Sequence, residues 1–238
     1  MYQDVAELRA FYARPLGQAV RRLLGHRIRA RWRNVGGQTL FGLGYAAPYI
    51  GAYRREAARM GALMPAAQGA LVWPRDGDSL SVLVDEMHLP LPGNSVDKLL
   101  AVHCLENAEQ TRHLLREMWR ILTPEGQLLL IVPNRRSMWA RFDTTPFGHG
   151  RPYSRSQLTR LLQEAMFVPS NWSWALHVPP IESNVILRSA IAFERIGARV
   201  WPGFGGIIMV EAGKQLIAPT LTGQRVRAPG GLVTIRGI

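Results

Sequence analysis

Three short stretches of the chain place a residue that can do chemistry at the end of an apolar run. Asp85 follows residues 82–84, and a carboxylate at the carboxyl end of a strand can accept hydrogen bonds from a ligand. Gly42 and Gly44 follow another run, where glycine lets a ligand approach the backbone or allows a positive φ. His103 lies in a third run, and an imidazole can take a proton near neutral pH. Structural roles are open as well, since Asp85 can cap the next turn and His103 can bond within the fold.

The pattern of apolar residues predicts the elements that position these side chains. Residues 99–105 and 128–132 are continuous apolar runs, typical of parallel strands covered on both faces. Between them, helical spacing predicts a helix that ends at the turn 123–126. Further strands are expected at 39–41, 62–64, 80–84, 172–178 and 205–210, and further helices at 4–33, 48–60, 155–164 and 184–200. The fold class is therefore α/β, a doubly wound, Rossmann-like, seven-stranded and mostly parallel sheet with helices on both faces.

The length of 238 residues suits one α/β domain with additions at its ends. We expect a basic helical extension at 1–34, the α/β domain at 35–214 and a basic, flexible tail at 215–238. The amino terminus lacks a secretory pattern, and the uncharged residues 35–53 are interrupted by glycines and Pro48, so we expect a cytoplasmic protein without a membrane span. Cys104 lies in an apolar run and is interpreted as a small core residue.

Positive charge is concentrated near the ends of the chain. The formal net charge is +12, and six arginines lie between Arg21 and Arg33. Such a segment favours an anionic partner, namely RNA, an acidic protein or a membrane surface, although a solvated basic face explains it equally well. No cluster of Cys and His has the spacing of metal ligands, so no metal is expected.

Five pieces in order resemble one family. They are Asp85, Leu89-Pro90, the run from Val96-Asp97 to Leu105-Glu106, and the turn at 121–126, preceded by the glycine loop. Together they resemble the class I S-adenosylmethionine-dependent methyltransferases, in particular the small-molecule-type domain, over about residues 35–170. The resemblance implies S-adenosyl-L-methionine as cofactor, an antiparallel seventh strand and a methyl acceptor that the sequence does not identify.

The resemblance also implies roles for individual residues. The glycine loop would carry the amino-acid end of the cofactor, Asp85 would accept from the adenine amino group, and Met87 would border the ring. The cofactor-binding residues implied are Gly42, Gly44, Tyr45, Asp85, Glu86, Met87 and His103, and His103 is also the catalytic candidate. His149, Arg151 and Tyr153 resemble a loop that closes over an acidic or aromatic substrate. A plainer alternative is that glycines shape this loop and Tyr153 packs.

Two departures from the family pattern open a second hypothesis. Leu40 stands where the family has an acid before the first glycine, and Met64-Pro65-Ala66 lacks the acid that binds the ribose hydroxyls. Losing such a contact costs roughly 1.5–3 kcal/mol of binding free energy. The leading hypothesis is a methyltransferase, which needs no catalytic triad because positioning lowers most of the barrier. The alternative is a non-catalytic methyltransferase-like partner or scaffold protein with weak or no cofactor binding.

Overall fold

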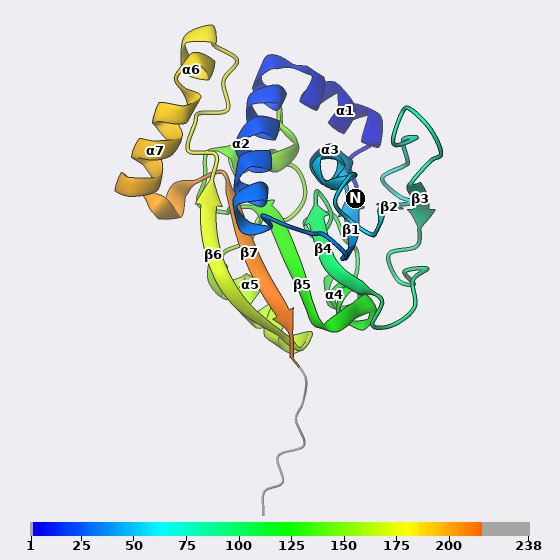
Figure 1. Cartoon of the computed structure of the whole chain (residues 1–238). Helices are drawn as coiled ribbons and strands as arrows, with labels where there is room; N and C mark the ends of the chain where they lie inside the picture. Colours follow the sequence, from blue (N-terminus) through cyan, green and yellow to red (C-terminus); the bar gives the residue numbers. More distant parts are fainter. Residues whose placement is uncertain (1, 216–238) are drawn as a thin grey trace, which may run out of the picture.

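The computed structural model describes residues 2–215, and its centre is a seven-stranded sheet (Figure 1). The strands are β1 (Thr39–Gly44), β2 (Arg59–Pro65), β3 (Ser81–Val84), β4 (Val96–Val102), β5 (Leu122–Pro133), β6 (Phe167–Ala175) and β7 (Ile207–Lys214). Their order is β3-β2-β1-β4-β5-β7-β6. Neighbours from β3 to β5 pair in parallel, and β7 pairs antiparallel with β5 and β6. The predicted α/β fold and its antiparallel seventh strand are confirmed.

Helices cover both faces of the sheet, as Figure 1 shows. They are α1 (Val5–Ala13), α2 (Pro15–Arg31), α3 (Ala47–Ile50), α4 (Thr111–Ile121), α5 (Arg155–Glu164), α6 (Asn184–Arg188) and α7 (Ala190–Val200), with short 3-10 turns at Gly51–Tyr53, Trp139–Arg141, Pro146–Gly148 and Pro202–Phe204. The near face carries α1, α2 and α3, and the far face carries α4 and α5. None of the helices described is long and apolar enough to cross a membrane.

The long helix α2 covers the near face because its apolar residues recur every four positions. Leu16, Val20, Leu24 and Ile28 are all buried and belong to one core cluster with Leu100, Leu129 and Met209 of the sheet. The helical region expected at 4–33 divides at Arg14, since α1 ends before Arg14 and Pro15 begins α2. On the far face, α4 buries its apolar stripe, and α5 begins with a capping box of Ser154 and Gln157.

Two predicted helices are shorter or broken. The helix expected at 48–60 is only α3 and the 3-10 turn at Gly51–Tyr53, because the buried Tyr53 turns inward, where its hydroxyl donates to the Trp32 carbonyl. The helix α2 supplies the cover that a longer helix would have given. The helix expected at 184–200 divides at Ser189 into α6 and α7. The tail predicted at 215–238 lies, except for Gln215, outside the described residues.

Half of the arginines between Arg21 and Arg33 bind carboxylates of the chain itself. Arg27 lies 3.0 Å from Glu194, Arg29 forms two hydrogen bonds with Glu56, and Arg31 lies 3.5 Å from Glu211. The other three, Arg21, Arg22 and Arg33, are exposed. The arginine-rich helix therefore holds other elements in place as well as presenting positive charge.

The buried Glu194 fixes α7 to the sheet and gives a test of this packing. Its carboxylate accepts from the backbone N–H groups of Leu176 and His177 and from Arg27. Replacing it by Gln is expected to lower the free energy of unfolding by about 1.5–3 kcal/mol at pH 7, since hydrogen bonds to a charged group are lost. Urea unfolding measures the effect, and the exposed Glu125→Gln should change it by less than about 0.5 kcal/mol.

The effect of Glu194 should depend on pH in a defined direction. Burial acts to raise the pKa of Glu194, but hydrogen bonds from His177 and the charge of Arg27 outweigh it, so the pKa lies below its ordinary value. The stabilisation is fully present above the pKa of this group in the unfolded chain and is lost as the pH falls through its lower pKa in the folded protein. The difference between wild type and variant should therefore shrink in acid, and an undiminished difference would contradict this assignment.

Candidate functional site

The carboxyl ends of β1, β2, β3 and β4 meet at one edge of the sheet, and the predicted site residues lie there. The parallel register places Gly44 beside Val102, one residue before His103. Pro65 pairs with Val84, so the residues that follow β2 lie beside Asp85. The sheet topology therefore brings the glycine loop, Asp85 and His103 to one edge, as predicted.

The two glycines are needed by the backbone of the protein itself. Gly44 has a φ of +75°, and a Cβ on it would lie 2.3 Å from the Val102 carbonyl oxygen. A Cβ on Gly42 would lie 2.7 Å from the Cβ of Ala46. Both distances are shorter than any real Cβ contact, so the turn allows β1 to lie close to β4 and α3. Packing within the protein therefore explains why both positions are glycine, without any need for a ligand.

His103 is buried in a network of polar groups beneath α1. Its φ is +50°, a conformation that non-glycine residues rarely adopt and that is often found at functional sites. The ring Nε2 lies 2.8 Å from the hydroxyl of Tyr12, and Nδ1 lies 3.4 Å from the Glu106 carboxylate. The backbone carbonyl of His103 accepts from the side-chain amide of Gln68. Through its ring and its backbone carbonyl, His103 thus connects α1, the residues after β2 and the loop after β4.

The amino-terminal segment from Tyr2 through α1 contacts the residues that follow all four strands. Tyr12 stacks on Tyr45, with 5.3 Å between ring centroids, and the Tyr2 hydroxyl donates to Glu86. The backbone N–H of Val5 donates to the Gln68 carbonyl at 2.8 Å. Burial raises the pKa of Tyr2 and of Tyr12 well above the ordinary range, so both hydroxyls stay protonated at neutral pH. The predicted amino-terminal extension is therefore a lid on this edge of the sheet.

Several polar atoms under this lid lack a hydrogen-bond partner in the protein. They include Gln68 Oε1 and Glu106 Oε2, and both residues are buried. An unpaired buried polar atom is unfavourable, so such atoms usually face an ordered water or a ligand. Cys104 lies beside them, and burial raises the pKa of its thiol, which confirms its interpretation as a core residue rather than a nucleophile.

Asp85 lies at the open margin of this site. Its Oδ1 accepts from the Met87 backbone N–H at 2.8 Å, and its Oδ2 lies 3.4 Å from His88 Nδ1. The Met87 hydrogen bond is the main reason that the pKa of Asp85 lies below its ordinary value. The carboxylate is 61% exposed. Asp85 thus caps the turn after β3, and its exposed carboxylate can accept further hydrogen bonds from the solvent side.

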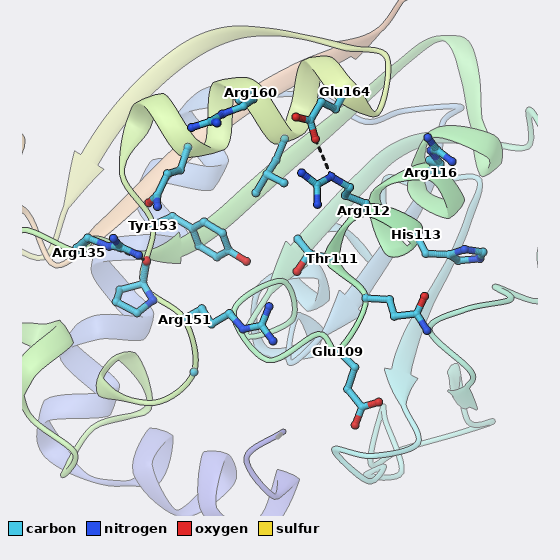
Figure 2. A pocket seen from close by; sticks show the side chains of 15 residues that line it. Glu109, Thr111, Arg112, His113, Arg116, Arg135, Arg151, Tyr153, Arg160 and Glu164 are labelled. Atoms are coloured by element: carbon cyan, nitrogen blue, oxygen red, sulfur yellow. Dashed lines mark hydrogen bonds and ion pairs between the residues drawn. The ribbon is translucent and has the colours of Figure 1, made fainter.

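A separate cavity of about 830 Å³ lies between α4, α5 and residues 150–153 (Figure 2). Its lining includes five arginines, Arg112, Arg116, Arg135, Arg151 and Arg160. Tyr153 also lines it, and its hydroxyl donates to the Leu105 carbonyl, while the Arg151 N–H donates to the Glu106 carbonyl. Residues 105–106 therefore form a wall between this cavity and the network of His103. His149 is not part of the lining and bonds instead to the Asp143 carbonyl.

Comparison with known proteins decides what kind of domain this is. Residues 46–130 match the family model of a methyltransferase domain. This part of the chain is therefore similar to a methyltransferase domain. A probable S-adenosylmethionine-dependent methyltransferase of Mycolicibacterium smegmatis is 36% identical over 81 residues, 33% of this chain and 31% of the relative. The chain thus spans about a third of the length of the curated relatives it matches.

Solved structures of methyltransferases share the fold of this chain. The methyltransferase in a complex with the Haloferax volcanii Trm112 methyltransferase activator has a TM-score of 0.63 and 20% sequence identity, covering 89% of this chain and 97% of that one. A SAM-dependent methyltransferase from Thermotoga maritima also has a TM-score of 0.63, with 17% identity, covering 89% and 96%. At these sequence identities the comparison shows a shared fold and nothing more.

The polar groups at this edge of the sheet fit a nucleoside cofactor. Gln68 and Glu106 offer free acceptors beside His103, and Asp85 offers another at the margin. In this structure Tyr2 and Tyr12 bond to Glu86 and His103 at the same edge. Sequence reasoning missed Tyr2, Tyr12 and Gln68. Of these three residues, only Gln68 could have been found from the sequence. It closely follows β2, where the family has its ribose-binding acid. Residues 2–215 contain no group of three His, Cys, Asp or Glu residues arranged to hold a metal.

Proposed function

We propose that the chain transfers a methyl group from S-adenosyl-L-methionine to an acceptor. The observation that carries the proposal is the buried network of His103, Glu106 and Gln68, with two unpaired acceptors, at the strand edge of a methyltransferase domain. Similarity to curated proteins named as probable S-adenosylmethionine-dependent methyltransferases supports it. When bound, the cofactor supplies a methyl group that is already activated, so the protein need only position the reactants.

We assign the residues of the site as follows. The loop with Gly42, Gly44 and Tyr45 faces the amino-acid end of the cofactor, and Asp85, Glu86 and Met87 face the adenine. Gln68 takes the place of the missing ribose-binding acid, since its free Oε1 can accept from a ribose hydroxyl. His103 takes the proton that the acceptor releases, and Glu106, 3.4 Å from its Nδ1, stabilises the charged imidazole.

Cofactor binding requires α1 to leave its position in this structure. The side chains of Tyr2 and Tyr12 bond to Glu86 and His103, which are both assigned to the cofactor site. The cofactor and the closed lid therefore compete for the same groups. The protein binds its cofactor through the open fraction of its molecules, and its apparent affinity is reduced by the size of that fraction.

Calorimetric titration with S-adenosylmethionine and S-adenosylhomocysteine tests the proposal. Wild type is expected to bind in the micromolar range, and Asp85→Ala should bind about tenfold more weakly because a hydrogen bond to the adenine amino group is lost. Asp76→Ala, which removes another exposed carboxylate, should bind as wild type does. Equal affinity of all three proteins would refute the role of Asp85, and no binding at millimolar ligand would favour the non-catalytic scaffold.

We further propose the remaining features of this function from charge and position. Arg151 and Tyr153 bind an anion in their own cavity, whose lining is rich in guanidinium groups and which lies apart from His103. Arg21, Arg22 and Arg33 are the arginines of α2 and its end that remain exposed for an anionic partner. We also propose a cytoplasmic location and domain boundaries at residues 34 and 214.

A further inference from the structure

The helices α6 and α7 carry an exposed apolar surface that the methyltransferase site does not use. Figure 1 shows both helices standing out from the body beyond β6. Ile196 is 60% exposed, Trp201 63% and Phe204 58%, and Val185 and Val200 are exposed as well. Large apolar side chains that gather on an exposed surface in this way indicate an interaction site. We call the residues from 181 to 204 the α6–α7 surface.

The inner face of α7 is already occupied, so the apolar residues cannot turn inward. Ala190 and Glu194 are buried, and a Cβ on Gly197 would lie 2.3 Å from the Cβ of His177. The carboxylate of Glu194 holds the helix to the backbone after β6. Rotation of α7 would break these contacts. The exposed apolar residues of α7 are thus held on the outer side of this helix.

Positive charge lies beside the apolar stripe. Ile196 and Val200 are four residues apart and share one side of α7, and Arg195 and Arg199 form a parallel stripe next to them. Arg188 at the end of α6 is exposed too. The two carboxylates of the segment are bound within the fold, Glu182 by Arg14 and Glu194 by Arg27. The outward surface therefore combines aromatic and aliphatic groups with arginines and little negative charge.

We propose that the α6–α7 surface docks the protein on an anionic lipid bilayer. Tryptophan, phenylalanine and isoleucine enter the interface between headgroups and acyl chains, while neighbouring arginines bind the anionic headgroups. The formal net charge of +12 adds long-range attraction to such a surface. A second copy of the chain is a poor alternative, since it would bring equal positive charges and the same arginine stripe together. The proposal does not depend on cofactor binding.

Co-sedimentation with vesicles tests the proposal on the full chain. Vesicles of phosphatidylcholine alone are compared with vesicles that also contain phosphatidylglycerol. The protein should bind the anionic vesicles, less tightly as salt rises, and should bind the neutral ones weakly. Replacing both Arg195 and Arg199 by Gln should weaken binding about 30-fold, by the usual contribution of basic residues at a membrane surface. Ile196→Asp should weaken it at least as strongly.

Matched variants separate this surface from the general charge of the protein. Arg55→Gln with Arg75→Gln removes the same charge from two other exposed positions, and Val82→Asp places the same acid on the exposed side of β3. Both should bind nearly as wild type does, and thermal unfolding checks that every variant is folded. Equal losses from both arginine pairs, or no preference for anionic vesicles, would overturn the proposal. So would a dimer in light scattering that Ile196→Asp dissociates, since that outcome assigns the surface to a second copy.

Discussion

Replacing Gly44 by Ala is expected to lower the free energy of unfolding by about 3 kcal/mol or more, through a left-handed backbone conformation and overpacking. The added Cβ would lie 2.3 Å from the Val102 carbonyl oxygen and 2.9 Å from the Cβ of Cys104. The first of these is a backbone atom of the central strand β4, so it cannot move aside as a flexible side chain would. The midpoint of thermal unfolding should fall by about 6–12 °C for a domain of this size.

Gly37 provides the matched control for this substitution. Its φ of +73° is nearly the same, but a Cβ there would meet nothing within 4 Å. Gly37→Ala should therefore show the conformational cost alone, about 1–2 kcal/mol. The difference between the two variants measures the close approach of β1 to β4. Equal destabilisation would show that the tight contact at Gly44 relaxes without cost, and the assignment of the glycine to packing would be wrong.

The glycine loop shows how far the sequence could lead. The continuous apolar runs predicted parallel strands, and those strands place Gly44, Asp85 and His103 at one edge of the sheet. A glycine that serves a ligand and a glycine that serves a strand contact look identical in sequence. Only the distance to Val102 tells them apart. The position of the site was thus predictable, while the reason for its glycine was not.

The lid on the site was not predictable, because its contacts join distant parts of the chain. Tyr2 reaches Glu86 across 84 residues and Tyr12 reaches His103 across 91. Local patterns predicted that α1 and α2 are amphipathic helices, but not which strand ends they cover. The shortness of α3 also depends on contacts between distant parts of the chain. The propensity of residues 48–60 favours a helix, yet α2 already covers that face, so tertiary packing overrides the local preference.

If α1 competes with the cofactor, weakening the lid should tighten binding. Tyr2→Phe removes a hydrogen bond to the Glu86 carboxylate from the closed state, and such a bond contributes roughly 1.5–3 kcal/mol. The open fraction should rise accordingly, so the apparent affinity for S-adenosylhomocysteine should increase about tenfold or more. Tyr12→Phe, which loses its bond to His103, should act in the same direction. Calorimetry on each variant measures the change.

A tyrosine outside the lid serves as the control. Tyr53 is buried and donates to the Trp32 carbonyl, so Tyr53→Phe makes the same chemical change without touching α1. It should lower stability slightly and leave the affinity for S-adenosylhomocysteine unchanged. Tighter binding by Tyr2→Phe and Tyr12→Phe alone would identify α1 as a competing lid. Weaker binding by these two would instead place their hydroxyls in contact with the cofactor, and the lid would then be a part of the binding site that closes over its ligand.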